Sequence, residues 1–368
     1  MKVGIIGLPS SGKTTVLNAV SGGSHEVHAY SGAASAEPNF AVVSVPDLRQ
    51  DWLKDLYKPK KTTYATVELV DVAGVAPGQA KADQISPQLL TSLRQVDALV
   101  NVVRAFDSAS VPHPSGSVDP LRDAETLELE LVIADLAVVE KRLGKIDQEI
   151  QRKKGGEKTQ LELEKELLSR FNEHLSGENA LRTLELDEDE KKLIRGYTFL
   201  SLKPIMVLAN ISESDIGSAD NQSLKALENW AEGRKMPFLA FCGKAEMEIA
   251  QLEESERAEF MEALGIEESS RDKFVRATYA LLDLVAFFTV GEDEVKAWTI
   301  PNKTVAQEAA GKIHTDIQRG FIRAEVLNFE QLKETGSWNA AKEKGLVRLE
   351  GKEYLVKDGD CINYRFAI

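Results

Sequence analysis

The sequence predicts an α/β protein with a phosphate-binding loop (P-loop), a two-helix insertion and a small C-terminal sheet. Three observations lead to this prediction. A short apolar strand runs directly into the motif G-x-x-x-x-G-K-T at residues 7–14. Two segments with apolar residues at heptad spacing meet at Gly155-Gly156, which predicts an antiparallel coiled-coil hairpin. After residue 284 the pattern changes to short strands around one helix.

Composition is that of an ordinary globular protein. The chain has 368 residues, of which 43% are hydrophobic and 28% are charged, and this length suggests two or three domains. The composition excludes a collagen, a disordered chain and a disulfide scaffold. The 45 Lys and Arg against 59 Asp and Glu give a net charge of −14. Such a charge argues against nucleic-acid binding through the molecule as a whole, although a local basic patch remains possible.

The chain carries no sign of a leader peptide, a membrane span or a metal-binding cysteine motif. Residues 1–7 are too short an apolar run for a signal peptide, and no stretch approaches 18 apolar residues. Cys242 and Cys361 are far apart in sequence and outside any metal-ligand spacing. We therefore expect a soluble, cytoplasmic protein with two free, buried or half-buried thiols and no membrane partner.

The motif at residues 7–14 stands between a predicted strand at 3–6 and a predicted helix at 15–20, which is the context a P-loop requires. Its backbone amides and the helix N-terminus suit a nucleotide phosphate. We expect Lys13 to reach the β- and γ-phosphates and to stabilise charge during hydrolysis, and the Thr14 hydroxyl to bind Mg²⁺. The predicted nucleotide-binding residues here are Pro9, Ser10, Ser11, Gly12, Lys13, Thr14 and Thr15.

A second metal anchor is predicted at the end of the strand 66–70, where the sequence reads D-x-x-G. Asp71 suits a direct or water-mediated Mg²⁺ ligand, and the Gly74 amide can meet the γ-phosphate. Val75 stands where many related hydrolases have a glutamine that orients the attacking water. His113, in the following Ser/Pro-rich loop, is a candidate for that catalytic task; the alternative is a solvated loop histidine.

The base site is predicted after a buried strand at 204–209, which leads into Asn210-Ile211-Ser212-Glu213. A guanine site needs N-K-x-D, so the Lys is missing and Glu replaces Asp. Asn210 can serve adenine, whose N6 donates and whose N7 accepts a hydrogen bond. This favours ATP over GTP, although Glu213 keeps guanine possible. The residues predicted to close the pocket from the other side include Cys242, Gly243 and Lys244.

The predicted hairpin has a clear seam and a basic tip. Its first helix repeats apolar residues at alternating spacings of three and four: Leu129, Val132, Leu136, Val139, Leu143, Ile146 and Ile150. Residues 141–158 include seven basic and three acidic residues, which gives this segment a net charge of +4. A solvated helix face is one reading of this run, and contact with RNA phosphates is the other.

The C-terminal region predicts a β-grasp arrangement, that is, a small mixed sheet crossed by one helix. Two strands at 286–290 and 295–300 flank a turn, and a helix follows at 304–314. Further short strands are predicted near 323–326, 347–349 and 362–366. This region suits either a binding module for RNA or ribosomal protein, or a packing domain.

Together these motifs resemble the YchF / Obg-like ATPase family of P-loop proteins over nearly the whole chain. The segments that carry the resemblance are Gly7-Leu8-Pro9, Gly12-Lys13-Thr14, Glu37-Pro38-Asn39, Val45-Pro46-Asp47, Asp71-Val72-Ala73-Gly74, Val118-Asp119-Pro120, the pair Asn210 and Glu213, and residues 297–300, 310–316, 320–326, 349–354 and 358–360.

The resemblance implies a Ras-like nucleotide domain at 1–120 and 201–283, interrupted by the helical insertion at 121–200 and followed by a ubiquitin-like TGS domain at 284–368. It implies a Mg²⁺-dependent hydrolase that uses ATP more readily than GTP and lacks the usual catalytic glutamine. Ser35 stands where the family presents a metal-binding threonine.

It also implies association with ribosomes, either with the large subunit or with the whole particle, as a regulatory switch. Contact with ribosomal RNA would use the hairpin tip and the TGS domain. Two alternatives remain: a nucleotide-gated adaptor with negligible turnover, and a GTP-preferring translational GTPase.

Overall fold

The computed structural model describes residues 1–22, 40–72, 87–108, 110–218, 220–266 and 268–367. The chain divides into two compact units. The first comprises Met1–Val42 and Glu68–Phe274, and the second comprises Val43–Val67 and Val275–Ile368. Within the described residues, we find no helix with the length and apolar character needed to cross a bilayer.

The first unit is built on a six-stranded sheet with the order β2-β4-β1-β5-β6-β7. Its strands are β1 (Lys2–Ile6), β2 (Phe40–Ser44), β4 (Thr66–Asp71), β5 (Ala98–Ala105), β6 (Ile205–Ile211) and β7 (Phe238–Phe241). The pairs β1–β4, β1–β5, β5–β6 and β6–β7 are parallel. Every residue of β5 and β6 is buried, as expected for central strands covered on both faces. The carboxyl ends of these strands therefore meet at one edge of the sheet.

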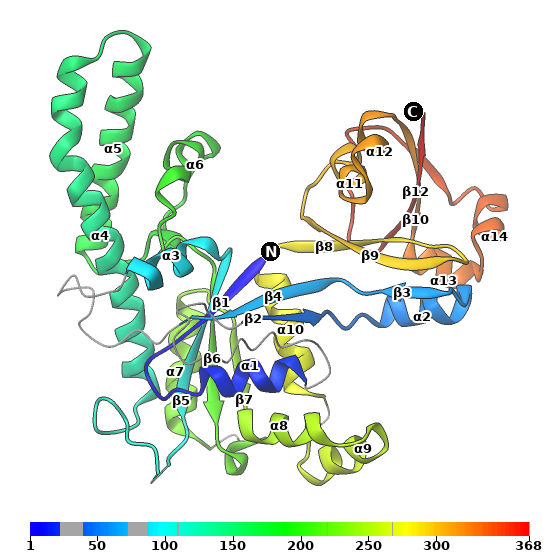
Figure 1. Ribbon diagram of the computed structural model, residues 1–368, viewed down its shortest axis with the longest axis horizontal. Helices are drawn as coiled ribbons and strands as arrows, with labels where there is room; N and C mark the ends of the chain where they lie inside the picture. The colour runs from blue at the N-terminus through cyan, green and yellow to red at the C-terminus, as the bar shows by residue number, and fades with distance from the viewer. Residues whose placement is uncertain (23–39, 73–86, 109, 219, 267, 368) are drawn as a thin grey trace. The chain divides into compact units, whose positions relative to one another are not determined.

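In the first unit some helices flank this sheet and others extend from it as an arm (Figure 1). They are α1 (Lys13–Ser21), α3 (Pro87–Gln95), α4 (Pro120–Arg152), α5 (Gly156–Ser176), α6 (Glu188–Ile194), α7 (Gln222–Gly233), α8 (Gly243–Gln251), α9 (Glu254–Ala263) and α10 (Ser270–Leu281), whose residues from Val275 onward belong to the second unit. The core joins the sheet to α3, α4 and α7 through Leu93, Leu99, Leu127, Val207 and Leu227.

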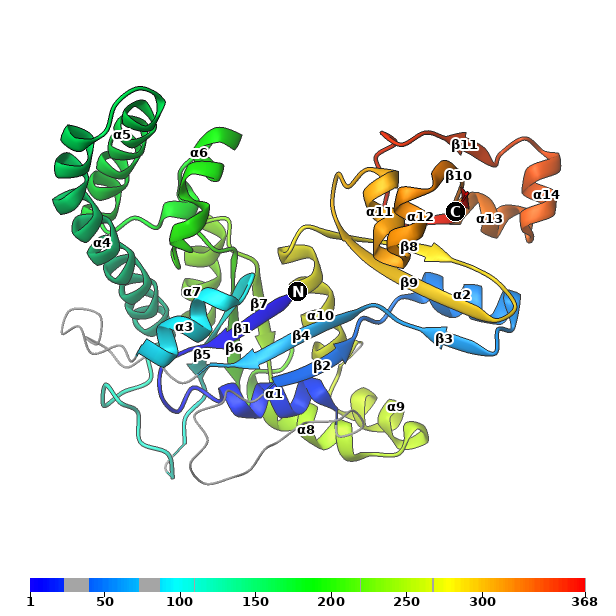
Figure 2. The ribbon, with the colours of Figure 1, turned by 45° about the horizontal axis from the view of Figure 1, so that its top comes forward.

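The predicted hairpin is confirmed. Figures 1 and 2 show α4 and α5 side by side as a two-helix arm. Val132, Val139 and Ile146 of the predicted seam are at most 1% exposed. The chain reverses at Gly155, whose φ of 59° lies in the left-handed region that glycine adopts without strain. All residues from 151 to 160 at this tip are exposed.

The second unit contains a mixed six-stranded sheet with the order β11-β10-β12-β8-β9-β3. Its strands are β3 (Lys61–Thr63), β8 (Leu284–Thr289), β9 (Glu294–Pro301), β10 (Phe321–Asn328), β11 (Arg348–Glu350) and β12 (Asp360–Phe366), and its helices are α2 (Leu48–Tyr57), α11 (Ala306–Ile313), α12 (Thr315–Arg319), α13 (Phe329–Thr335) and α14 (Trp338–Glu343). Each strand predicted after residue 284, and the helix between them, is present. Phe287, Ile300 and Ala309 form the core between the sheet and α11.

Residues 43–67 depart from the predicted order of domains. The sequence analysis placed them within the nucleotide domain at 1–120, but the structure groups them with the C-terminal residues. The physical reason is a parallel pairing in which Lys61, Thr62 and Thr63 face Glu294, Val295 and Lys296. Arg49 of α2 also forms an ion pair with Asp358 at 2.6 Å. Because these partners lie more than 200 residues apart in the sequence, no local sequence pattern predicts their contacts.

Candidate functional site

The loop after β1 has the geometry of a phosphate cradle. A Cβ atom on Gly7 would lie 2.4 Å from the carbonyl oxygen of Val102, and one on Gly12 would lie 2.2 Å from Nδ2 of Asn210. Gly12 also has a φ of 96° and caps the N-terminus of α1. Both positions therefore require glycine, and the loop wraps tightly enough for its amides to reach an anion.

Lys13 folds back over this loop. Its ammonium group donates hydrogen bonds to the carbonyl oxygens of Gly7 at 3.2 Å and Leu8 at 3.0 Å. Burial lowers the pKa of Lys13, while the charge of Asp71 acts in the opposite direction. A cation that is partly desolvated at a phosphate cradle interacts strongly with anionic ligands. The geometry thus agrees with the predicted role of Lys13 at the phosphates.

The two predicted metal ligands among the described residues lie together. The Thr14 hydroxyl donates a hydrogen bond to Oδ2 of Asp71 at 2.8 Å. Burial raises the pKa of Asp71, and the Thr14 hydrogen bond and the charge of Lys13 only partly offset that effect. Two hard oxygen donors placed side by side fit a divalent cation such as Mg²⁺. Ser35 and Gly74, the other predicted contacts on this side, lie outside the described residues.

The structure brings Asn210 to the same site but gives its amide a different partner. Nδ2 donates to the Ser11 carbonyl oxygen at 3.0 Å, and Oδ1 accepts from the Gly243 backbone N–H at 3.2 Å. The side chain is 5% exposed. Asn210 therefore joins the P-loop to the start of α8, and base reading by this residue stays a prediction.

Glu213 and Lys244 form an ion pair beside Asn210. Their side-chain atoms Oε2 and Nζ are 2.9 Å apart, and this contact is the largest cause of the raised pKa of Lys244. The Glu213 carboxylate is thus already engaged by a cation. Two other predicted residues of this region, Ile211 and Cys242, line a cavity of about 560 Å³. Gly243 lies next to Thr15 of α1.

Both cysteines are free and buried, as expected. Cys242 stands at the N-terminus of α8, and burial raises its pKa. Among the described residues, no group of three or more His, Cys, Asp and Glu side chains could hold a metal ion by itself. A Mg²⁺ site here would depend on Thr14, Asp71 and the nucleotide's own oxygens. Mg²⁺ is commonly bound in this way, by a few protein ligands together with the phosphates of the substrate.

His113 lies in the loop between β5 and α4 and is not solvated. Its Nε2 is 2.7 Å from Oδ2 of Asp123, and both side chains are 4% exposed. Its Nδ1 accepts a hydrogen bond from the Ser115 backbone N–H at 3.1 Å. The reading of His113 as a solvated loop residue is therefore wrong. Its predicted task at the attacking water stays a prediction, since both ring nitrogens are occupied in this arrangement.

Comparison with known proteins places these features in a family. A family model named YchF-GTPase_C and described as "Protein of unknown function (DUF933)" matches residues 284–367. A second, MMR_HSR1, described as "50S ribosome-binding GTPase", matches residues 2–154. A Bacillus subtilis protein, "Ribosome-binding ATPase YchF", is 41% identical over 100% of both chains. The chain belongs to the YchF family.

Further YchF proteins agree with this assignment. "Ribosome-binding ATPase YchF" of Escherichia coli O157:H7 is 40% identical, with 100% of this chain and 99% of that one covered. The solved structure of the Schizosaccharomyces pombe YchF GTPase has a TM-score of 0.86 at 30% identity and covers 99% of this chain and 97% of its own. The chain thus has the P-loop GTPase fold with the C-terminal YchF domain.

Two arginines support the YchF site from positions that the sequence analysis missed. Arg104 of β5 pairs in register with Asn210 and is 2% exposed. Its guanidinium donates to the carbonyl oxygens of Phe106 and Val111 at 3.1 and 2.9 Å, which fixes the start of the loop that carries His113. An arginine inside a mostly apolar, fully buried strand was the available signal.

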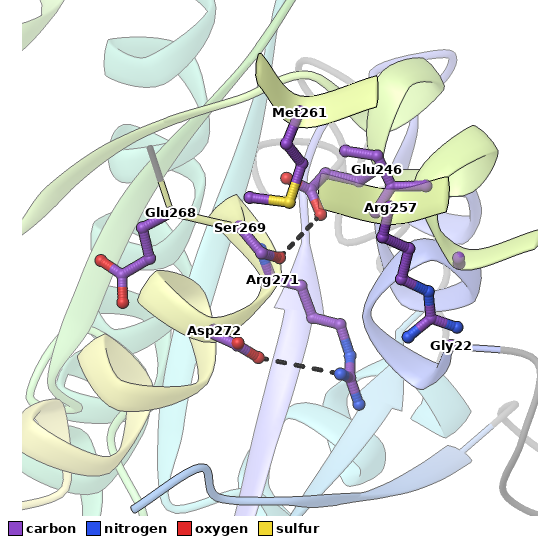
Figure 3. A pocket seen from close by; sticks show the side chains of 10 residues that line it. Gly22, Glu246, Arg257, Met261, Glu268, Ser269, Arg271 and Asp272 are labelled. Carbon is purple, nitrogen blue, oxygen red and sulfur yellow. Dashed lines mark hydrogen bonds and ion pairs between the residues drawn. The ribbon is translucent and has the colours of Figure 1, made fainter. Parts of the chain in front are cut away.

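Arg271 supports the other end of α1. Figure 3 shows it in a pocket of about 370 Å³ between α8, α9 and α10. Its Nε donates to the carbonyl oxygen of Val20 at 2.7 Å, beside Gly22, which ends α1. The guanidinium therefore satisfies a carbonyl at the helix C-terminus, where a cation is favourable. No short-range pattern predicts this contact, because 251 residues separate the partners.

Proposed function

We propose that this protein is a Mg²⁺-dependent P-loop ATPase that works slowly, in the cytoplasm, as a nucleotide-controlled regulator on the ribosome. The observation that carries the proposal is the grouping of Lys13, Thr14 and Asp71 at the ends of two neighbouring parallel strands. The names of the relatives, which describe ribosome-binding ATPases, supply the nucleotide and the partner.

The site residues divide the work on the phosphates. Backbone amides from Ser10 to Thr14 hold the phosphate oxygens, and Lys13 exchanges its two carbonyl partners for the β- and γ-phosphates. Thr14 and Asp71 would hold the metal, which Ser35 is predicted to complete. Bound Mg²⁺ supplies neutralisation of the charge shared by the β- and γ-phosphates. The protein's own contribution is to position these groups in advance of the reaction.

The proposed preference for ATP rests on the base side. Guanine recognition requires a carboxylate free to accept hydrogen bonds from two guanine N–H groups. Here the Glu213 carboxylate is paired with Lys244 at 2.9 Å. Binding guanine would require that pair to break, whereas adenine presents no such pair of donors to the carboxylate. GTP therefore binds with the cost of a lost ion pair, and ATP does not.

Ribosome contact is assigned to the hairpin tip and the C-terminal unit. The tip carries Lys153 and Lys154 on an exposed turn, and residues 141–158 around it have a net charge of +4 in an acidic protein. RNA phosphates attract such a patch, and its strength would fall with added salt. The C-terminal sheet and α11 form a separate folded module, which we interpret as a TGS domain.

The deciding experiment is titration calorimetry with Mg²⁺ and non-hydrolysable ATP and GTP analogues. We expect tighter binding of the ATP analogue, and a loss on the order of 100-fold in Lys13→Ala because a charged hydrogen bond to phosphate is removed. Lys60→Ala, which removes a lysine with an 81% exposed side chain, is the matched control. Tighter binding of GTP would place the protein among GTP-preferring translational GTPases, and binding of neither would refute the proposal.

One observation favours a second function, a nucleotide-gated adaptor with negligible turnover. Both ring nitrogens of His113 are engaged within the protein. Turnover measured with and without purified ribosomes separates the two functions. An ATPase on the ribosome releases phosphate faster when ribosomes are present, whereas an adaptor binds ribosomes with nucleotide and releases none.

A further inference from the structure

The His113 side chain is held in a closed arrangement at the start of α4. Its Nε2 meets Oδ2 of Asp123 at 2.7 Å, and its Nδ1 accepts the Ser115 N–H at 3.1 Å. A backbone hydrogen bond also closes this loop: the Gly116 N–H donates to the His113 carbonyl oxygen at 3.0 Å. With 4% exposure and both nitrogens occupied, the ring has no free atom to offer a water molecule.

Asp123 is itself fixed by a neighbour. Its second oxygen, Oδ1, accepts hydrogen bonds from Nε and Nη2 of Arg122 at 3.1 and 2.9 Å. Nη2 of the same guanidinium donates to the Ser117 carbonyl oxygen at 2.7 Å, so the loop and the helix are tied at two points. Each carboxylate oxygen of Asp123 therefore has one assigned partner, and the oxygen not used by Arg122 holds His113.

The loop that contains His113 begins at the catalytic edge of the sheet. It follows β5, and β5 is the direct neighbour of β1, with Val100 opposite Ile5 and Asn101 opposite Ile6. The P-loop starts from β1 at this same edge, and Asp71 ends β4 on the other side of β1. His113 thus lies on a loop that leaves the sheet at the same edge as the P-loop, and Asp123 holds its ring.

We propose that Asp123 is a positioning residue that restrains His113 and so sets the low basal rate of hydrolysis. This proposal rests on the proposed ATPase function and describes how the same site is regulated. When the pair opens and the ring also leaves the Ser115 N–H, the unprotonated Nδ1 of the imidazole accepts a proton from the attacking water, while Nε2 keeps the proton that it donated to Asp123. The water oxygen bonds to the γ-phosphorus as the bond to the β,γ-bridging oxygen breaks, ADP keeps that oxygen, and the imidazole passes the proton to solvent.

The test compares Asp123→Ala, Asp123→Asn and Asp123→Ala/His113→Ala in steady-state ATP hydrolysis by the full-length protein. We expect kcat to rise about 10-fold in Asp123→Ala, because general-base assistance contributes about 10²–10⁴-fold when fully available. KM for ATP should change little, since no phosphate contact is altered. Asp123→Asn, which keeps the shape and one oxygen, should lie between. The double variant should return to the wild-type rate or below it.

Asp119→Asn is the matched control. Asp119 caps the same helix through a hydrogen bond to the Arg122 N–H, and asparagine is an equally good cap. This variant removes an acid near the start of α4 without touching His113, so its kcat should stay at the wild-type value. A fall in kcat for Asp123→Ala would overturn the proposal, because Asp123 would then orient His113 productively. An unchanged kcat, or a rise that survives in the double variant, would also overturn it.

A second readout does not depend on turnover. Hydrogen exchange of the backbone amides of Ser115 and Gly116 reports whether the loop is closed. We expect exchange to accelerate at least about 10-fold in Asp123→Ala, while the P-loop helix α1 stays protected. Unchanged exchange would refute the restraint even if hydrolysis changed. If no variant shows phosphate release that depends on Lys13, the ATPase proposal fails, and the exchange result alone decides the role of Asp123.

Discussion

Where the site is predicted to bind phosphates, the backbone geometry is in place before any ligand. Where it is predicted to bind the base, the side chains already contact one another. The P-loop presents its amides because Gly7 and Gly12 leave no room for a Cβ atom. At the base end, Asn210 uses both ends of its amide within the protein and Glu213 is paired with Lys244. The predicted phosphate site is thus preformed, while base recognition at the predicted base site would have to compete with internal contacts.

This difference explains why one end of the site would contribute affinity and the other would contribute base selectivity. A backbone cradle accepts any nucleoside triphosphate, so it contributes affinity without selecting a base. Selectivity comes from the cost of separating polar groups that are already satisfied. Asn210 connects the two ends, because one of its hydrogen bonds reaches the P-loop and the other reaches the start of α8.

The largest effect is expected from Gly12→Ala. The new Cβ would lie 2.2 Å from Nδ2 of Asn210, at a residue whose φ of 96° is strained for alanine. ATP-analogue affinity, measured by calorimetry, should fall on the order of 100-fold, which corresponds to about 2.7 kcal/mol. Gly144→Ala is the matched control, since a Cβ there meets nothing within 4 Å and the site is helical. Equal affinity in both variants would show that the cradle is not preformed.

A smaller effect on binding, with a clear effect on stability, is expected from Asn210→Ala. It leaves the Ser11 carbonyl and the Gly243 N–H without their partner at a position where the native side chain is only 5% exposed. The free energy of unfolding in urea should fall by about 2–4 kcal/mol. Asn302→Ala, which removes an exposed amide with a hydrogen bond to Asp283, should change it by less than about 1 kcal/mol. Lost ATP preference at unchanged stability would identify Asn210 as a base reader instead.

The sequence predicted those parts of the molecule whose determinants are local. The P-loop, the seam of the hairpin and the turn at Gly155 depend on residues within one or two elements, and each was found. In each case the spacing of residues along the chain is the physical cause of the structure.

Contacts between distant segments were not predictable in this way. The pairing of β3 with β9 joins residues more than 200 positions apart and moves 43–67 into the C-terminal unit. The Asp123–His113 pair spans ten residues, yet nothing in the sequence shows that the loop folds back onto α4. The role of Asn210 at the base stays a prediction, and its partners at Ser11 and Gly243 depend on how distant segments meet at the sheet edge.

The smallest effect, and the one that most sharpens the comparison, is expected from Lys244→Ala. Removing the ammonium group frees the Glu213 carboxylate to accept hydrogen bonds from guanine. Because the pair is exposed to solvent, its strength is modest, and the ratio of GTP to ATP affinity should rise only about threefold. Lys225→Ala, on α7 at the rim of the neighbouring cavity, is the control and should leave the ratio unchanged. A ratio that also stays constant in Lys244→Ala would mean that the ion pair does not set the base preference. The selection against guanine would then lie in the length of Glu213 itself, which Glu213→Asp would test in the same titration.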